Sequence, residues 1–224
     1  GIDAVLWMLR QATGYYDGNT FVETWQNLDV TAVHDGVYTE YHGDPMQVQP
    51  VLEIRGRYRD FAVLETTILG VLSRASRVAT NVLNVLEATR GKPLLFFPAR
   101  FDMPSVQAVD GYAYWLAVQR HKADSGRDIQ ALVSTDAQGS WWGGSGVGTV
   151  PHALIACFLG DEVAAMRAFA TYIPIGVPRI ALADFNNDSV GVVLGTMRAY
   201  WGEYVKALEA GDEEAQTRWT LNGV

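Results

Sequence analysis

The stretch from Ile129 to His152 reads IQALVSTDAQGSWWGGSGVGTVPH, and it decides the fold because it runs from an apolar segment through a glycine-rich loop toward a helix. Ile129–Ser134 is typical of a buried strand. Pro151 suits the first turn of a helix, where its missing N–H costs nothing. Glycines let a backbone approach an anion closely and direct its N–H groups at it. The stretch predicts a phosphate site after a strand, although glycine loops are also common connectors.

Three residues at the end of this loop are candidates for that site. Gly148 and Thr149 would bind the phosphate, with Thr149 also capping the helix. His152 would lie in the first turn, where the positive end of the helix dipole faces the occupant of the loop. Neutral imidazole acts as a nucleophile or a base, so His152 is the candidate catalytic group.

An alternation of apolar strands and helices extends outward from this stretch. We expect strands at 94–97, 129–134, 179–183 and 219–224, and helices at 106–120, 151–172 and 189–208. This order indicates parallel βα units, in a sheet or a barrel. Ligands of such folds bind at the carboxyl ends of the strands, where Phe97, Arg100, Asp184 and Asp188 follow.

The part before Pro93 mixes shorter elements. We expect a helix at 2–11, strands at 30–33, 36–41 and 48–58, and a long helix from about 61 to 88. Arg55, Arg57 and Arg59 would share one face if residues 53–59 form a strand. They could bind an anionic substrate, or they could be a solvated strand face.

Composition excludes some classes of partner. The 224 residues carry a formal net charge of −8, which argues against nucleic acid or an anionic membrane as the main partner. The apolar runs are too short to cross a bilayer. The one cysteine, Cys157, cannot form an internal disulfide, so we expect a reducing, cytoplasmic location. The last residues, Trp219–Val224, look like a strand without a continuation, so we expect a piece of a longer protein.

Four motifs, in order and with matching gaps, resemble nicotinate phosphoribosyltransferase. They are EIRGRYRDF at 53–61, ETTILG at 65–70, GTVPHAL at 148–154 and ADFNND at 183–188. The resemblance implies a type II phosphoribosyltransferase with an N-terminal α/β sandwich domain beside an irregular, TIM-like α/β barrel. Residues 1–92 would then be part of the sandwich domain and residues 93–224 the first part of the barrel.

The family's reaction joins nicotinate to phosphoribosyl pyrophosphate and releases pyrophosphate. The resemblance implies Mg²⁺, coupled ATP hydrolysis through phosphorylation of His152, and a homodimer or higher homo-oligomer. Phe97 would stack on the pyridine ring, Arg100 would bind a substrate anion, and Arg57 matches a family arginine. Asp184 would be catalytic, and Asp184 and Asp188 would hold Mg²⁺ or ribose hydroxyls, with helix capping as the alternative for either.

One departure bears on the substrate. Relatives often carry a second arginine after the position of Arg100, whereas this chain has Phe101 and Asp102. A nicotinamide- or quinolinate-type phosphoribosyltransferase therefore stays open as an alternative. A non-catalytic binding or regulatory relative is the alternative of another class.

Overall fold

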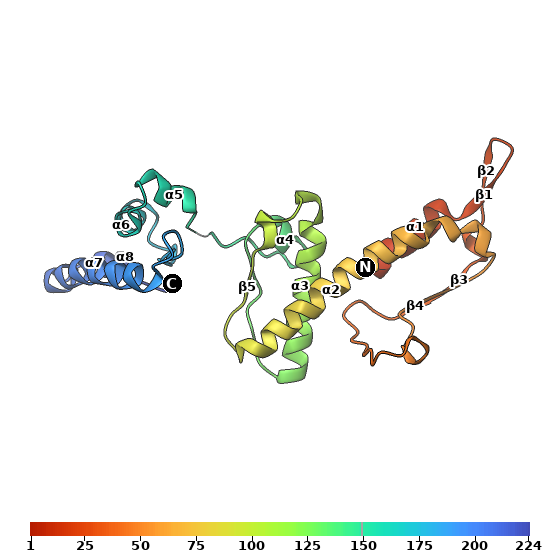
Figure 1. The fold of residues 1–224 in the computed structure, drawn as a ribbon, viewed down its shortest axis with the longest axis horizontal. Helices are drawn as coiled ribbons and strands as arrows, with labels where there is room; N and C mark the ends of the chain where they lie inside the picture. Colours follow the sequence, from red (N-terminus) through yellow and green to blue (C-terminus); the bar gives the residue numbers. More distant parts are fainter. Residues whose placement is uncertain (149) are drawn as a thin grey trace. The chain divides into compact units, whose positions relative to one another are not determined.

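The computed structural model describes residues 1–148 and 150–224, which divide into two compact units, Gly1–Val147 and Gly148–Val224. Figure 1 shows the elements of each unit. The first unit contains α1 (Ile2–Ala12), β1 (Gly14–Asp17), β2 (Thr20–Glu23), β3 (Asp29–Ala32), β4 (Leu52–Arg55), α2 (Glu65–Thr89), β5 (Leu95–Phe96), α3 (Gln107–Ser125), β6 (Leu132–Val133) and α4 (Asp136–Gly139). The second contains α5 (His152–Cys157), α6 (Glu162–Tyr172), α7 (Ser189–Ala210) and α8 (Glu213–Arg218).

Helix α1 and the β3–β4 pair pack against the start of α2, and a second antiparallel pair, β1–β2, follows α1 along the chain. Strand β1 pairs with β2, and β3 pairs with β4. Helix α1 has apolar residues at helical spacing, and Val5 and Leu9 from its inner face pack with Ile68 of α2 in one buried cluster. This cluster is the smaller apolar core of the first unit.

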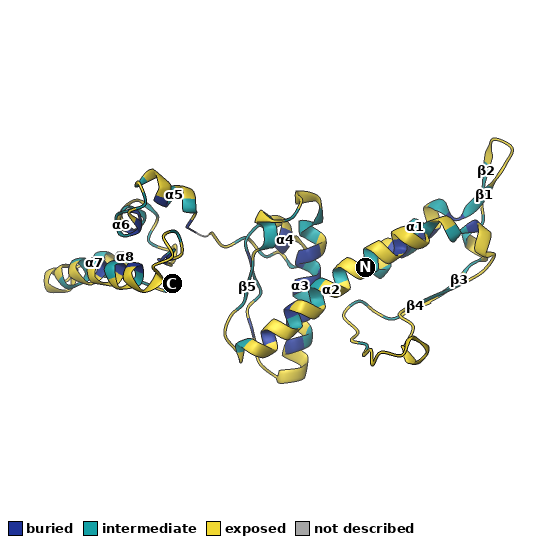
Figure 2. Ribbon diagram, in the orientation of Figure 1, coloured by how far each residue is buried: buried dark blue, intermediate teal, exposed yellow. Residues whose placement is uncertain are grey.

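The larger core lies between α2, α3 and a parallel strand pair. Val82 and Leu86 of α2 and Val118 of α3 are buried against Val133 of β6. Figure 2 shows buried residues on both long helices. Strands β5 and β6 are parallel, with α3 as the connection between them. This is the βα unit that the alternation of apolar segments predicts.

Tyr114 joins α3 to the edge of that strand pair. Its side chain is fully buried, and its ring stacks on Phe96 at a centroid distance of 4.9 Å. Its hydroxyl donates to the carbonyl of Leu94 and accepts from the N–H of Leu132, each at 2.9 Å. A single buried phenol thus satisfies one backbone group beside each strand, which fixes their relative position.

An ion pair crosses from α2 to α3. Arg74 donates from Nε and from Nη2 to the two carboxylate oxygens of Asp110, at 2.9 and 2.7 Å. Asp110 is only 1% exposed, and Arg74 also lies 2.9 Å from Asp102. The hydrogen bond to Asp110 and then that to Asp102 raise the pKa of Arg74. Forked donors that match two oxygens hold the helices in one register.

Helix α3 approaches α4 so closely that one position requires glycine. A Cβ on Gly111 would lie 2.0 Å from the carbonyl oxygen of Gln138. Gln138 is itself buried and completes a capping box with Thr135, the N-cap of α4. The backbone contact therefore leaves no room for a side chain at position 111.

Two long helices and the segments after them form the core of the second unit. Met166 and Ala170 of α6 pack with Tyr200 of α7 and Ala181. The Tyr200 hydroxyl donates to the carbonyl of Met166 at 2.8 Å, and burial raises the pKa of Tyr200 to about 12. Ile180 and Gly223 form an isolated parallel bridge.

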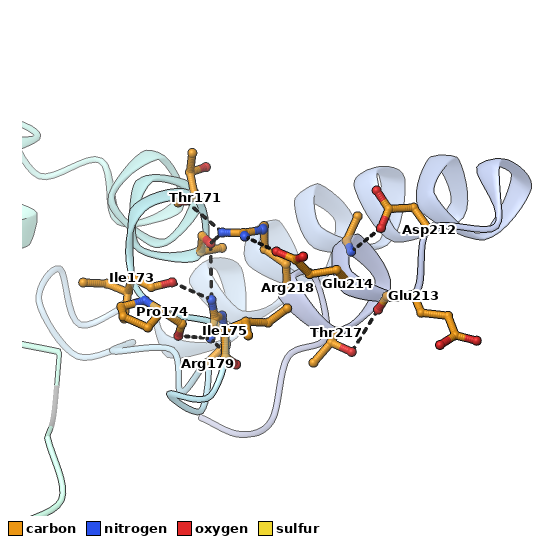
Figure 3. A network of polar contacts seen from close by, with 12 residues as sticks. Thr171, Ile173, Pro174, Ile175, Arg179, Asp212, Glu213, Glu214, Thr217 and Arg218 are labelled. Carbon is orange, nitrogen blue, oxygen red and sulfur yellow. Dashed lines mark hydrogen bonds and ion pairs between the residues drawn. The ribbon is translucent and has the colours of Figure 1, made fainter.

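Two arginines satisfy the carbonyl end of α6 (Figure 3). Arg179 is 1% exposed and donates to five backbone carbonyls, those of Ala170, Ile173, Pro174, Ile175 and Val177. Arg218 donates to the carbonyls of Ala170 and Thr171 at 3.3 and 3.0 Å. Burial lowers the pKa of Arg179. Cations suit this position because the last carbonyls of a helix carry partial negative charge.

The mixed α/β class is confirmed, and several expected elements differ. Among the described residues the strands form three two-stranded sheets and no closed barrel. Residues 36–41 form no strand, and the segments 179–183 and 219–224 contribute only the bridge between Ile180 and Gly223. The spacing of apolar residues also did not predict α8. The boundary expected between residues 92 and 93 stays a prediction.

We expect Gly111→Ala to lower the free energy of unfolding by about 1–3 kcal/mol, because the new methyl group would overlap a backbone carbonyl. Urea unfolding measures this. Gly70→Ala is the matched control, since Gly70 is exposed in α2 with no atom within 4 Å of the new Cβ, and it should raise stability by about 0.5–1 kcal/mol. Equal effects of the two changes would contradict the close approach at Gly111.

Arg179→Lys tests the guanidinium at the end of α6. An ammonium group has three donors for five carbonyls, so we expect a loss of at least about 2 kcal/mol in the free energy of unfolding. Arg198→Lys, at an exposed position of α7, should change it by less than about 0.5 kcal/mol. If Arg179→Lys unfolded at the same temperature or urea concentration as the unchanged protein, the hydrogen bonds of the Arg179 guanidinium would add no stability.

Candidate functional site

His152 and Asp184 lie together in the second unit. His152 is the first residue of α5, and its Nε2 is 3.1 Å from Oδ1 of Asp184. Both side chains remain accessible, at 37% and 66% exposure. The ring of Phe185 lies beside the imidazole, with centroids 6.1 Å apart. An accessible imidazole with a carboxylate at one nitrogen can be oriented for contact with a bound anion.

A buried carboxylate supports the loop that carries Asp184. Glu162, in the first turn of α6, is 4% exposed and accepts from the N–H groups of Phe185 and Asn186 at 3.1 and 3.4 Å. Its other oxygen accepts from Nδ2 of Asn186 at 3.2 Å. The pattern of the sequence did not single out Glu162. The pair Asp161-Glu162 is typical of a helix start, but nothing in the pattern ties it to a loop so far along the chain.

Asp188 has a structural position. It is the N-cap of α7, and its Oδ1 accepts from the N–H of Gly191 at 2.9 Å. Asp188 therefore has the alternative role that the sequence left open for it, which is helix capping. Asp184 makes no such contact with the helix, and it faces His152 instead.

The glycine loop is built by close backbone packing within the first unit. A Cβ on Gly139 would lie 2.2 Å from the carbonyl oxygen of Gly144, and one on Gly146 would lie 2.7 Å from Cα of Thr135. Gly143 has a φ of 73°, which favours glycine. Close backbone packing or a positive φ requires glycine at these positions. This agrees with the alternative that the loop is a connector.

The end of the loop leads into α5, whose N-cap is Pro151. Thr149, the residue expected to cap this helix, lies outside the described residues. Gly148 is exposed, with open space where a Cβ would be. Phosphate binding by Gly148 and Thr149 stays a prediction.

Phe97 is the N-cap of a short 3₁₀ helix, Pro98–Arg100, directly after β5, and Arg100 is the last residue of this helix. Phe97 is 57% exposed, and Arg100 is exposed as well. An exposed aromatic ring and a guanidinium at a strand's carboxyl end are available to a ligand. Asp102, two residues after Arg100, forms an ion pair with Arg74 at 2.9 Å.

Arg57 lies at a junction of structural contacts. Its Nε is 3.1 Å from Oδ1 of the buried Asp60, and its guanidinium stacks over Tyr15 at 4.9 Å. Half of the Arg57 side chain remains exposed. Strand β4 ends at Arg55, so the expected strand face shared by Arg55, Arg57 and Arg59 is wrong.

Within 1–148 and 150–224, no three or more His, Cys, Asp or Glu side chains come together as a metal site. Asp184 faces His152 and Asp188 caps α7, and the expectation that these two acids hold Mg²⁺ stays a prediction. No helix described there has the length and apolar character needed to cross a bilayer.

Comparisons with known proteins point to one group of enzymes. Residues 19–76 match the family profile described as Quinolinate phosphoribosyl transferase, N-terminal domain. The crystal structure of nicotinate-nucleotide pyrophosphorylase from Pyrococcus furiosus is similar to this chain, with a TM-score of 0.57 and 34% sequence identity. The similarity covers 75% of this chain and 39% of that one, so the chain spans well under half of the matched structure.

These findings correct the assignment made from the motifs. The identification with nicotinate phosphoribosyltransferase is wrong, because the profile and the solved structure both point to the quinolinate enzyme. ATP as a co-substrate and phosphorylation of His152 lose their basis with it. The motifs misled because short motifs that related enzymes share reflect the fold, and a fold does not specify which pyridine is bound.

Asp188→Ala should lower the free energy of unfolding by about 1 kcal/mol, because the first turn of α7 loses its cap. Asp188→Asn is the matched control and should stay near the unchanged protein, since an asparagine oxygen caps equally well. Thermal unfolding measures both. If Asp188→Asn destabilised the chain as much as Asp188→Ala, the carboxylate would have a role beyond capping.

Proposed function

We propose that this chain is part of a quinolinate phosphoribosyltransferase, which joins quinolinate to phosphoribosyl pyrophosphate and releases nicotinate mononucleotide, carbon dioxide and pyrophosphate. The agreement of two comparisons supports the proposal most strongly. A quinolinate phosphoribosyl transferase profile matches residues 19–76, within the first unit, and the matched structure is named for pyrophosphorolysis of nicotinate nucleotide. We also propose that the whole enzyme has an α/β barrel beside an N-terminal α/β sandwich domain.

The chemistry sets what the protein must provide. The pyridine nitrogen forms a bond to C1′ of the ribose as the bond to pyrophosphate breaks, with positive charge developing on the sugar. The carboxyl group at C2 then leaves as carbon dioxide, its bonding electrons stay at C2 beside the cationic nitrogen, and a proton replaces it. Both substrates are anionic, so binding requires cationic and hydrogen-bond-donating groups in an acidic chain.

Accessible groups within each unit suit these needs. Arg100 and the exposed half of Arg57 are the proposed ligands of carboxylate or phosphate oxygens. Phe97 is the proposed stacking partner of the pyridine ring. His152, with its Nε2 facing Asp184, is proposed to lie against the substrate phosphate, together with Gly148 and Thr149.

Turnover by the full-length protein tests this proposal. Quinolinate, nicotinate and nicotinamide are each supplied with phosphoribosyl pyrophosphate, and we expect pyrophosphate release with quinolinate, together with one carbon dioxide per nucleotide. Addition of ATP should not change the rate. Faster turnover of either other pyridine would contradict the assignment. Failure with all three would indicate a non-catalytic relative.

His152→Gln and Asp184→Asn should each lower kcat/KM by about 10–100-fold, the range for loss of a hydrogen bond to a charged group. His42→Gln is the matched control, because His42 is an exposed histidine near Glu40, away from the candidate residues in sequence. It should leave kcat/KM unchanged. A loss of activity in the control equal to that of His152→Gln would remove the special role of His152.

A further inference from the structure

Glu162 stands out among the buried charged groups because its side-chain partners among residues 1–148 and 150–224 all belong to one loop. Its two oxygens accept from the N–H of Phe185, the N–H of Asn186 and the Nδ2 of Asn186. These donors come one and two residues after Asp184. A buried carboxylate without such donors would be costly, so the loop and the carboxylate stabilise one another in this geometry.

A second contact ties the same loop to the helix of His152. Nδ2 of Asn186 also donates to the carbonyl of Gly160 at 2.9 Å. Gly160 lies in the turn that ends α5, where its N–H donates to the carbonyl of Ile155 at 3.0 Å. Ile155 is fully buried, so this turn is anchored in the unit. Asn186 therefore lies between the end of α5 and Glu162.

Backbone conformation adds to the constraint on the loop. Gly160 has a φ of 87° and Asn187 a φ of 58°, both in the left-handed region. Asp188 then caps α7. The loop is held at both ends, and Asp184 is the acidic residue in it that faces the imidazole.

We infer that Glu162 is a positioning residue, which sets the position of Asp184 against His152 through the backbone of Phe185 and Asn186. The part of this inference that concerns catalysis rests on the proposed function. Glu162 is buried, so it would act on the reaction through the loop that carries Asp184. The geometric part of the inference concerns the histidine ring alone and can be tested without substrate.

Glu162→Gln is the decisive change. The amide oxygen can still accept from the two backbone N–H groups, but the amide nitrogen then faces Nδ2 of Asn186, donor against donor. We expect the loop to shift and Asp184 to leave Nε2 of His152. Asp161→Asn is the matched control: it removes one negative charge at the adjacent, exposed N-cap and keeps the cap.

The readout is the ¹⁵N spectrum of the His152 ring in the full-length protein, assigned by the loss of its signals in His152→Gln. A carboxylate at Nε2 favours the tautomer with the proton on Nε2. We expect Glu162→Gln to shift the ring signals toward a mixture of tautomers, as Asp184→Asn does, while Asp161→Asn leaves them unchanged. In the turnover assay, kcat/KM of Glu162→Gln should fall by up to about 100-fold.

A folded Glu162→Gln protein with an unchanged His152 spectrum overturns the inference. If that variant does not fold, Asn186→Ala decides, because it cuts the side-chain links to Glu162 and Gly160 without changing any charge. It should shift the ring signals in the same direction, and an unchanged spectrum overturns the inference. If the spectra change as expected but no pyridine is turned over, the positioning stands and the proposed function fails.

Discussion

A buried polar group needs partners, and this requirement organises both units of the chain. The guanidinium of Arg179 is the clearest case, because its five carbonyl partners come from the end of α6 and the segment that follows. It fixes the start of the segment 179–183, which leads directly to Asp184. The asparagine side chain of Asn222 adds to this by accepting from the N–H of Arg179 at 2.7 Å. The position of the candidate site thus depends on a charge that never contacts it.

The first unit uses the same principle with different groups. Arg74 and Asp110 align α2 and α3, and the hydroxyl of Tyr114 joins α3 to the ends of β5 and β6. Each group has hydrogen-bond partners that are distant in sequence. Each therefore constrains how the helices and strands are arranged, in addition to the energy of its own hydrogen bonds. Phe97 and Arg100 follow β5 and are therefore held by a strand whose position Tyr114 sets.

The motifs did not specify the substrate of the related enzymes. Gly148–Leu154 and Ala183–Asp188 include residues with structural roles, such as Asp188, which caps α7. Arg100-Phe101-Asp102 was the one departure that bore on the pyridine, and Asp102 is engaged by Arg74. The correction from nicotinate to quinolinate came from similarity over longer segments.

The amino-acid pattern by itself determined the long helices and the parallel βα order, because periodic burial and caps are local properties of the chain. It correctly brought out α2, α3 and α7, the parallel pair of β5 and β6, and the capping alternative for Asp188. It also drew attention to both His152 and Asp184, which the structure places 3.1 Å apart. Only the tertiary structure decided that Glu162 supports their loop, that Arg179 closes α6, and that Gly111 and Gly139 serve backbone packing. The contacts of Glu162 and Gly111 join segments distant in sequence, while those of Arg179 and Gly139 arise where the chain folds back on itself within a few residues. No local periodicity records which of these groups will meet.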